Sequence, residues 1–274
     1  MKWDRIALQL YSVRDEMKAD FYGTLKKVKE MGYTGVEFAG LHGHDPLEVK
    51  QMCEELGLER VSAHVDLELF LSELEETVEC YRKLGVPYVT VPFLDVEYRP
   101  GKEAFLSIPD SLKKIGEAVK KAGMTLQYHN HDFEFLKIED DIYGLDYLYR
   151  EVSPELLQTQ LDTCWIKVTG EDPVEYLKKY AGRIPTVHLK DFVGRRTNNM
   201  YGLLGKEEVK AESTEKFGFR PLGKGVQDFP AVVAAGIENG AKWFIVEQDS
   251  PSLGYTPLQC AEISVKYLLN EVFV

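Results

Sequence analysis

Short apolar runs along the chain alternate with longer segments in which apolar residues recur at the helical spacing of about 3.6 positions. Each longer segment is followed by a glycine and then by the next apolar run, as in "VKEMGYTGVEFAG" and "YRKLGVPYVTVPF". A glycine at this place typically ends a helix in the left-handed conformation. The glycines that punctuate the pattern are Gly32, Gly57, Gly85, Gly123, Gly182 and Gly240. The pattern therefore predicts repeated units of one strand and one helix.

Two strands lack the glycine signal, "RIALQLYS" at residues 5–12 and "SPELLQTQLD" at residues 153–162. With them the chain holds eight strand–helix units in 274 residues. Clear helical spacing covers residues 21–31, 71–84, 106–122 and 257–270. We therefore predict an α/β fold in which residues 1–274 form a single (β/α)₈ TIM barrel. A doubly wound open sheet is disfavoured because no G-x-G-x-x-G follows the first strand.

The charge and the cysteines narrow the range of partners and compartments. The formal net charge is −12, which argues against a nucleic-acid partner because phosphate binding needs a basic face. The amino terminus lacks the apolar run of a secretory signal, and no segment is apolar enough to span a bilayer. The four cysteines lie far apart, without a C-x-x-C pair, as in reduced proteins. We expect a cytoplasmic protein with no membrane association.

Several predicted strands end in polar side chains, and a barrel of this kind takes its catalytic groups from the carboxyl ends of its strands. Asp162, His188 and Glu247 end three consecutive strands and would meet at one mouth of the barrel. Oxygen and nitrogen donors of this kind suit Mn²⁺, Mg²⁺, Co²⁺ or Zn²⁺. Glu37 and His64 also end strands, and each of them either faces a substrate or only caps and solvates the chain.

The stretch "LQYHNHDFEF", residues 126–135, ends the fifth strand and is the densest group of reactive side chains. It brings His129, His131 and Glu134 to the expected catalytic face. The histidines either contact a substrate or pack as a hydrogen-bonded pair at the top of the barrel. Lys190 shares a strand face with His188, and we expect it to pair with a buried carboxylate or to contact a substrate oxygen.

The combination of "YHNHDFEF", "LDTCW", "HLKD", "LGKG" and "VEQD" resembles the xylose isomerase-like barrels, which include sugar phosphate isomerases and epimerases. The resemblance covers nearly the whole chain. It implies one divalent metal ion, held by Glu, Asp, His and Glu from strands five to eight. Asp162, His188 and Glu247 match the last three of these ligands.

The chain departs from the family pattern at the first ligand, because His129-Asn130-His131 stands where many members read Glu-Asn-His. Our preferred replacement is Glu134, reaching back from just beyond the strand. Direct coordination by His129 or His131 is the alternative. A second departure is Trp165, where epimerase-like relatives often carry a substrate-binding histidine. This aromatic ring either stacks on a sugar face or fills the core.

A polar insertion at residues 192–225 follows the seventh strand. A loop of this length on the catalytic face predicts a lid or a specificity segment. Arg195, Arg196 and Lys224 could grip an anionic group of the substrate, or could be ordinary solvated loop charges.

These residues and the resemblance together predict a divalent-metal-dependent sugar isomerase or epimerase. It would move a proton next to a carbonyl through a metal-stabilised enediolate. Glu247 and Glu134, or one of them with His129, would carry the proton. Loss of a β-hydroxyl from the same intermediate would make it a dehydratase, as in inosose dehydratase. A barrel that binds a sugar without transforming it is the non-catalytic alternative. The resemblance also implies a sugar or polyol substrate and a homo-oligomer.

Overall fold

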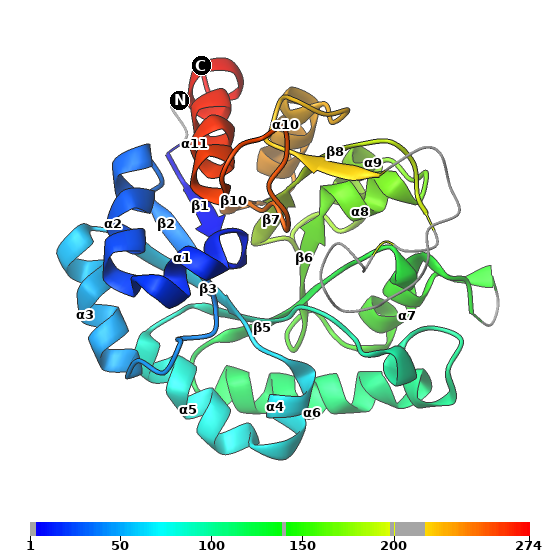
Figure 1. The fold of residues 1–274 in the computed structure, drawn as a ribbon. Helices are drawn as coiled ribbons and strands as arrows, with labels where there is room; N and C mark the ends of the chain where they lie inside the picture. Colours follow the sequence, from blue (N-terminus) through cyan, green and yellow to red (C-terminus); the bar gives the residue numbers. More distant parts are fainter. Residues whose placement is uncertain (1–3, 139–140, 198–199, 201–216) are drawn as a thin grey trace.

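The computed structural model describes residues 4–138, 141–197, 200 and 217–274. Parallel strands close into a barrel in the order β1-β10-β7-β6-β5-β4-β3-β2, and helices surround it (Figure 1). This arrangement confirms the predicted (β/α)₈ barrel. Its strands are β1 Ile6–Gln9, β2 Gly35–Ala39, β3 Glu59–His64, β4 Tyr88–Val91, β5 Thr125–His129, β6 Gln158–Asp162, β7 Thr186–Leu189 and β10 Trp243–Val246.

The helices follow the strands in the predicted alternation, and all six punctuating glycines have positive φ, between 63° and 110°. The prediction of one helix over residues 71–84 is wrong, because Glu73 interrupts the helix with a non-helical backbone, where φ is −135° and ψ is 46°. The longer helices are α2 Phe21–Met31, α3 Pro46–Leu56, α5 Leu74–Leu84, α6 Ile108–Lys121, α7 Gly144–Glu151, α9 Pro173–Lys179, α10 Phe229–Glu238 and α11 Pro257–Tyr267. The shorter ones are α1 Arg14–Ala19, α4 Leu67–Ser72 and α8 Thr163–Val168.

The strands alternate between an apolar outer face and an unusually polar interior. Outward side chains such as Leu126 and Val187 pack against the helices in the main core. Inside, Ala7, Val61 and Ile245 form a small apolar cluster. Buried polar side chains from seven of the strands share the barrel interior, namely Gln9, Glu37, Ser62, Thr90, Gln127, Gln160 and Thr186. A barrel interior is usually filled with branched aliphatic residues, so this polar interior requires a hydrogen-bond network.

The insertion after β7 is fixed to the barrel at both of its described ends. Strand β8, Asp191–Val193, pairs antiparallel with β9, Gly218–Arg220. The Asp191 carboxylate accepts hydrogen bonds from five backbone N–H groups, at 2.9–3.2 Å. Those groups belong to Phe192, Gly223, Gly225, Val226 and Gln227. A Cβ atom at Gly225 would lie 2.2 Å from Asp191 Oδ1, which explains the second glycine of "LGKG".

The remainder of the predicted lid, residues 198–199 and 201–216, lies outside the described residues. Over the described part of the chain, none of the helices is both long enough and apolar enough to cross a membrane.

Candidate active site

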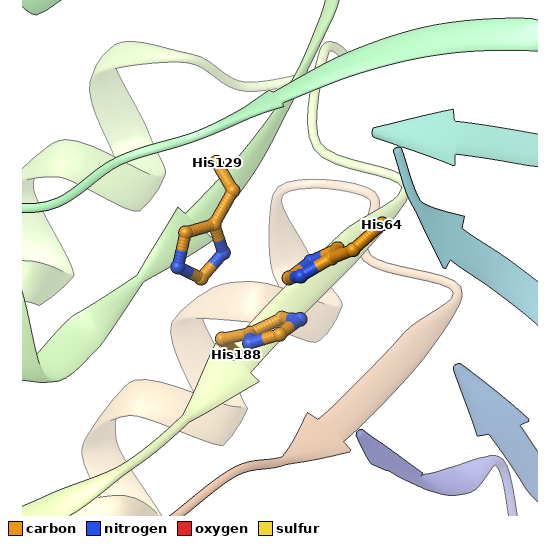
Figure 2. Close-up of side chains that lie close together, drawn as sticks. All are labelled: His64, His129 and His188. Carbon is orange, nitrogen blue, oxygen red and sulfur yellow. The ribbon is translucent and has the colours of Figure 1, made fainter. Parts of the chain in front are cut away.

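Three histidines from separate strands converge inside the mouth of the barrel (Figure 2). His64 ends β3, His129 ends β5 and His188 lies in β7. The ring centroids of His129 and His188 are 4.6 Å apart, and those of His64 and His188 are 5.4 Å apart. Because the carboxyl ends of all these strands meet at one face, residues far apart in the chain form one cluster.

Two of these histidines join two carboxylates in a group that could hold a metal ion. One donor atom each of His129, Asp162, His188 and Glu247 lies within 4.8 Å of the others, and all four side chains are buried. Asp162, His188 and Glu247 are therefore brought together as the sequence predicted. The remaining member of the group is His129, which is the alternative ligand that the sequence left open.

Glu37 lies beneath this group and orients it. Its carboxylate accepts hydrogen bonds from Gln9 and Gln160, each at 2.6 Å, and lies 2.7 Å from His188 Nε2. The other ring nitrogen of His188 faces Glu247 Oε2 at 3.1 Å. A carboxylate behind a ligating histidine fixes the orientation of its ring. Glu37 is fully buried and outside the pocket lining, so it lies behind His188. The sequence had offered Glu37 either as a substrate contact or as a residue that caps and solvates the chain.

The protonation of the two histidines differs for clear electrostatic reasons. Burial and the neighbouring His188 hold the pKa of His129 well below its ordinary value, so this imidazole is neutral and ready to ligate. Burial also opposes the charged form of His188, but Glu37 and Glu247 outweigh it and raise the pKa of His188 to about 10. His188 would release this proton on binding a metal ion.

Lys190 supplies the permanent positive charge of the site. Its Nζ lies 2.6 Å from Asp249 Oδ2, 2.9 Å from Glu247 Oε2 and 3.5 Å from Asp162 Oδ2. Burial lowers the pKa of this amine, but the three carboxylates outweigh it and hold the pKa well above its ordinary value. The structure thus shows the buried ion pair that the sequence offered as one role for Lys190.

The charge and the donors of this cluster fit a divalent cation. Four buried carboxylates, those of Glu37, Asp162, Glu247 and Asp249, face the charges of Lys190 and His188, so negative charge remains even with His188 protonated. Asp162 Oδ1 accepts from the backbone N–H groups of Cys164 and Trp165, which begin α8. Asp162 Oδ2 is buried and accepts no hydrogen bond among the described residues, and its contacts there are Lys190 Nζ at 3.5 Å and His129 Nε2 at 3.7 Å. Buried carboxylate oxygens are paired or bind metals, and two nitrogen and two oxygen donors suit Zn²⁺, Mn²⁺ or Co²⁺.

The structure does not bring Glu134 into this ligand group. A 3₁₀ turn at Phe133–Phe135 directs its carboxylate to the outer side of β5. There it accepts hydrogen bonds from the Tyr128 hydroxyl at 2.5 Å and from the His131 backbone N–H at 2.8 Å. Because Tyr128 faces away from the barrel interior, this arrangement disagrees with our preferred assignment of Glu134 as the first metal ligand.

A Glu134→Gln variant is expected to bind metal as the wild type does. Its free energy of unfolding should depend less on pH than that of the wild type. Burial raises the pKa of Glu134 to about 8, against the hydrogen bonds from Tyr128 and His131. The folded protein then holds a proton that the unfolded chain releases above about pH 4.5. The contribution of Glu134 to wild-type stability should therefore fall as pH rises from 4.5 to 8, by up to about 1.4 kcal/mol per pH unit. Urea unfolding at several pH values should show a flatter profile for the variant. Loss of bound metal in the variant would instead support our first assignment of Glu134 as a metal ligand.

The other predicted substrate contacts lie outside the pocket lining. Trp165 is fully buried, with Phe217 stacked on its ring at 6.1 Å and Lys190 Nζ 5.2 Å from the ring centroid. This position agrees with the alternative that Trp165 fills the core. Arg195 and Lys224 are exposed and outside the pocket lining. The neighbouring Arg196 donates from Nε to Asp132 at 2.6 Å.

A pocket of about 350 Å³ opens beside the ligand group. His64, His129, His131 and Glu247 lie in its wall, which places the predicted substrate residues His64 and His131 where a ligand would touch them. The remaining lining residues are Tyr11, Ala39, Gly40, Val65, Asp66, Leu69, Tyr81, Pro92, Phe93 and Asp249.

Sequence reasoning missed two polar residues of the site. Gln160 Oε1 lies 2.7 Å from His64 Nε2 and 3.1 Å from His129 Nδ1, and so links two of the histidines. Its signal was present in "QTQLD", where Gln160 alternates onto the same strand face as Asp162. The second is Asp249, which lines the pocket and pairs with Lys190.

Comparison with known proteins identifies the family. Residues 25–270 match the model of the xylose isomerase-like TIM barrel, and the chain belongs to this family. An inosose dehydratase of Geobacillus kaustophilus is 27% identical over 271 residues, covering 89% of this chain and 85% of the relative. An inosose dehydratase of Clostridium perfringens is 25% identical, covering 86% and 85%.

Solved structures share the fold. A sugar phosphate isomerase/epimerase from Parabacteroides distasonis superposes with a TM-score of 0.80 at 22% identity, covering 99% of this chain and 96% of the other. The IolI protein, solved with a bound zinc atom, has a TM-score of 0.71 at 15% identity, covering 98% of each chain. The chain is thus a member of a family of sugar-modifying enzymes.

Proposed function

We propose that the protein is a metal-dependent dehydratase that removes water from a cyclic polyol ketone such as an inosose. The observation that carries the proposal is the ligand group of His129, Asp162, His188 and Glu247. Two of its members, His129 and Glu247, line a pocket that His131 also lines. The names of the relatives support dehydration over the isomerase or epimerase activity that the sequence suggested first.

A divalent ion held by these four residues would supply positive charge where the substrate carbonyl oxygen becomes negative on loss of the adjacent proton. Glu37 would keep the His188 ring in place, and Lys190 would balance the surrounding carboxylates.

His131 is the proton carrier in this proposal, because it lines the pocket and stands outside the ligand group. Its ring lies between aromatic neighbours, with centroids 5.0 Å from Phe93 and 5.7 Å from Phe133, and the Phe133 ring is nearly parallel to it. Its backbone N–H is held by Glu134. The imidazole would remove the proton next to the carbonyl and return it to the β-hydroxyl. The hydroxyl then leaves as water, and no co-reactant is needed.

A His131→Ala variant tests this assignment. We expect its rate of dehydration of an inosose, and of proton exchange from D₂O, to fall by about 100- to 10,000-fold. The metal content should stay unchanged because His131 is not a ligand. His44→Ala is the matched control, since His44 follows β2 outside the pocket lining and should leave the rate unchanged. Full activity in His131→Ala would remove His131 from the mechanism. If the metal-loaded wild type exchanges no proton in inososes, the proposed function itself is wrong.

Isomerisation and epimerisation share the first step with dehydration. An L-ribulose 3-epimerase has the same fold, with a TM-score of 0.71 at 18% identity. The product separates the reactions, because dehydration yields an enone that absorbs in the ultraviolet and epimerisation does not. Exchange without this absorbance would favour the epimerase.

A further inference from the structure

The pocket beside the ligand group has two chemically different walls. One wall carries the polar groups His129, His131, Glu247 and Asp249, from the ends of β5 and β10. The other comes from the segments after β3 and β4 and is mostly apolar. It consists of Val65, Leu69, Tyr81, Pro92 and Phe93, with the carboxylate of Asp66 between Val65 and Leu69 in the chain. A polyol ring can pack one C–H face on an aromatic side chain, but its edge carries hydroxyls that need hydrogen-bonding groups. A single ring therefore covers only part of a wall that contains five apolar side chains.

Leu69 is the clearest sign that the apolar wall is left partly uncovered by the described residues. It stands on the short helix α4 at the pocket, and 42% of its surface is exposed. Phe93 and Tyr81 lie in the same wall and are only 8% and 7% exposed, so they give it a firm aromatic base. Covering apolar surface stabilises a complex in proportion to the area removed from water. An apolar ligand group would gain this energy at the β3–β4 wall.

The size of the pocket also exceeds that of a bare ring. Its volume of about 350 Å³ equals that of about a dozen water molecules, at about 30 Å³ each. The twelve heavy atoms of an unsubstituted inosose are covalently bonded and fill much less than this. The whole volume lies at the lower end of the range of pockets that hold larger, partly apolar ligands.

The charge of the lining disfavours an anionic substituent. Asp66, Glu247 and Asp249 are acidic, and none of the lining residues in the described part of the chain is lysine or arginine. Asp66 makes no side-chain capping bond to α4, so its carboxylate remains available to a hydroxyl donor. Lys190 is occupied by three carboxylates. A phosphate group would meet like charge at this pocket.

From these observations we infer that the substrate is an uncharged cyclic polyol ketone bearing an apolar group of about phenyl size, which lies on the β3–β4 wall. The orientation of the ring rests on the proposed function, because the carbonyl must face the ligand group. The apolar contact itself depends only on the shape and chemistry of the pocket.

Matched substrates test the inference with the metal-loaded enzyme. We expect kcat/KM for proton exchange to be at least about tenfold higher with phenyl 3-keto-β-glucoside than with its methyl counterpart. The 6-phosphate of the methyl compound should react more slowly than the methyl compound itself. Leu69→Ser should reduce the phenyl-to-methyl ratio severalfold. Leu71→Ser, on the same helix, 44% exposed and outside the pocket lining, should leave that ratio unchanged.

A binding measurement separates this inference from the proposed function. Phenyl β-glucoside and methyl β-glucoside lack the ketone, so their affinities report on the wall without any reaction. Tighter binding of the phenyl compound, weakened by Leu69→Ser, supports the inference even if no ketone reacts. Equal affinities and equal kcat/KM values for the two compounds, or a preference for the phosphorylated one, would overturn it.

Discussion

Replacing Asp162 with asparagine is expected to remove the bound metal and to lower turnover by about three orders of magnitude, the loss seen when a charge-stabilising group is deleted. The effect should be specific because the amide keeps the oxygen that accepts from Cys164 and Trp165 at the start of α8. Only the second carboxylate oxygen, which has no hydrogen-bond partner among the described residues, is replaced by a group that cannot ligate.

Metal analysis of the purified protein, circular dichroism and the exchange assay measure this outcome together. Asp172→Asn is a matched control, since Asp172 caps α9 through the Val174 N–H and is exposed. This control should keep both metal and turnover. An Asp162→Asn protein that folds and retains a full complement of metal would contradict the ligand group.

Replacing Lys190 with methionine is expected to destabilise the metal-free protein by about 3–5 kcal/mol, because one partner of a buried ion pair is removed and the other is left uncompensated. Here Glu247 and Asp249 would lose their closest positive charge. A divalent cation compensates the same carboxylates, so metal loading should restore part of the lost stability.

Urea unfolding in EDTA and in excess Mn²⁺ measures both effects. Lys178→Met is the control, because Lys178 pairs with Glu175 on an exposed helix surface and should leave stability almost unchanged. If the Lys190→Met protein is as stable as wild type in EDTA, the electrostatic description of this cluster is wrong.

The barrel could be predicted because its signals are local. Each glycine that ends a helix and each apolar run that follows it can be identified within about a dozen residues, and the closed order of the strands follows from repeating the unit. The convergence of Asp162, His188 and Glu247 followed from the same geometry, since the ends of parallel strands share one face.

The position of Glu134 could not be predicted because sequence spacing does not give the direction of a side chain beyond a strand end. A single 3₁₀ turn directs it to Tyr128, on the outer face of the barrel. The sequence also does not show how deep in the barrel a side chain at a strand end will lie. Glu37 and His64 both belong to strand ends, but only His64 reaches the pocket, whereas Glu37 remains buried beneath His188. Such differences arise from the register between strands, which includes an irregularity at Val36 and Glu37.

The five hydrogen bonds that hold Asp191 also fix the position of Lys190. Asp191 follows Lys190 directly, so the backbone that carries the lysine is held by the contacts of Asp191 with residues 223–227. The cost of closing a loop between two fixed ends grows only slowly with its length. A change in the length of the segment between β8 and β9 is therefore expected to leave Lys190 in place beside Asp162 and Glu247.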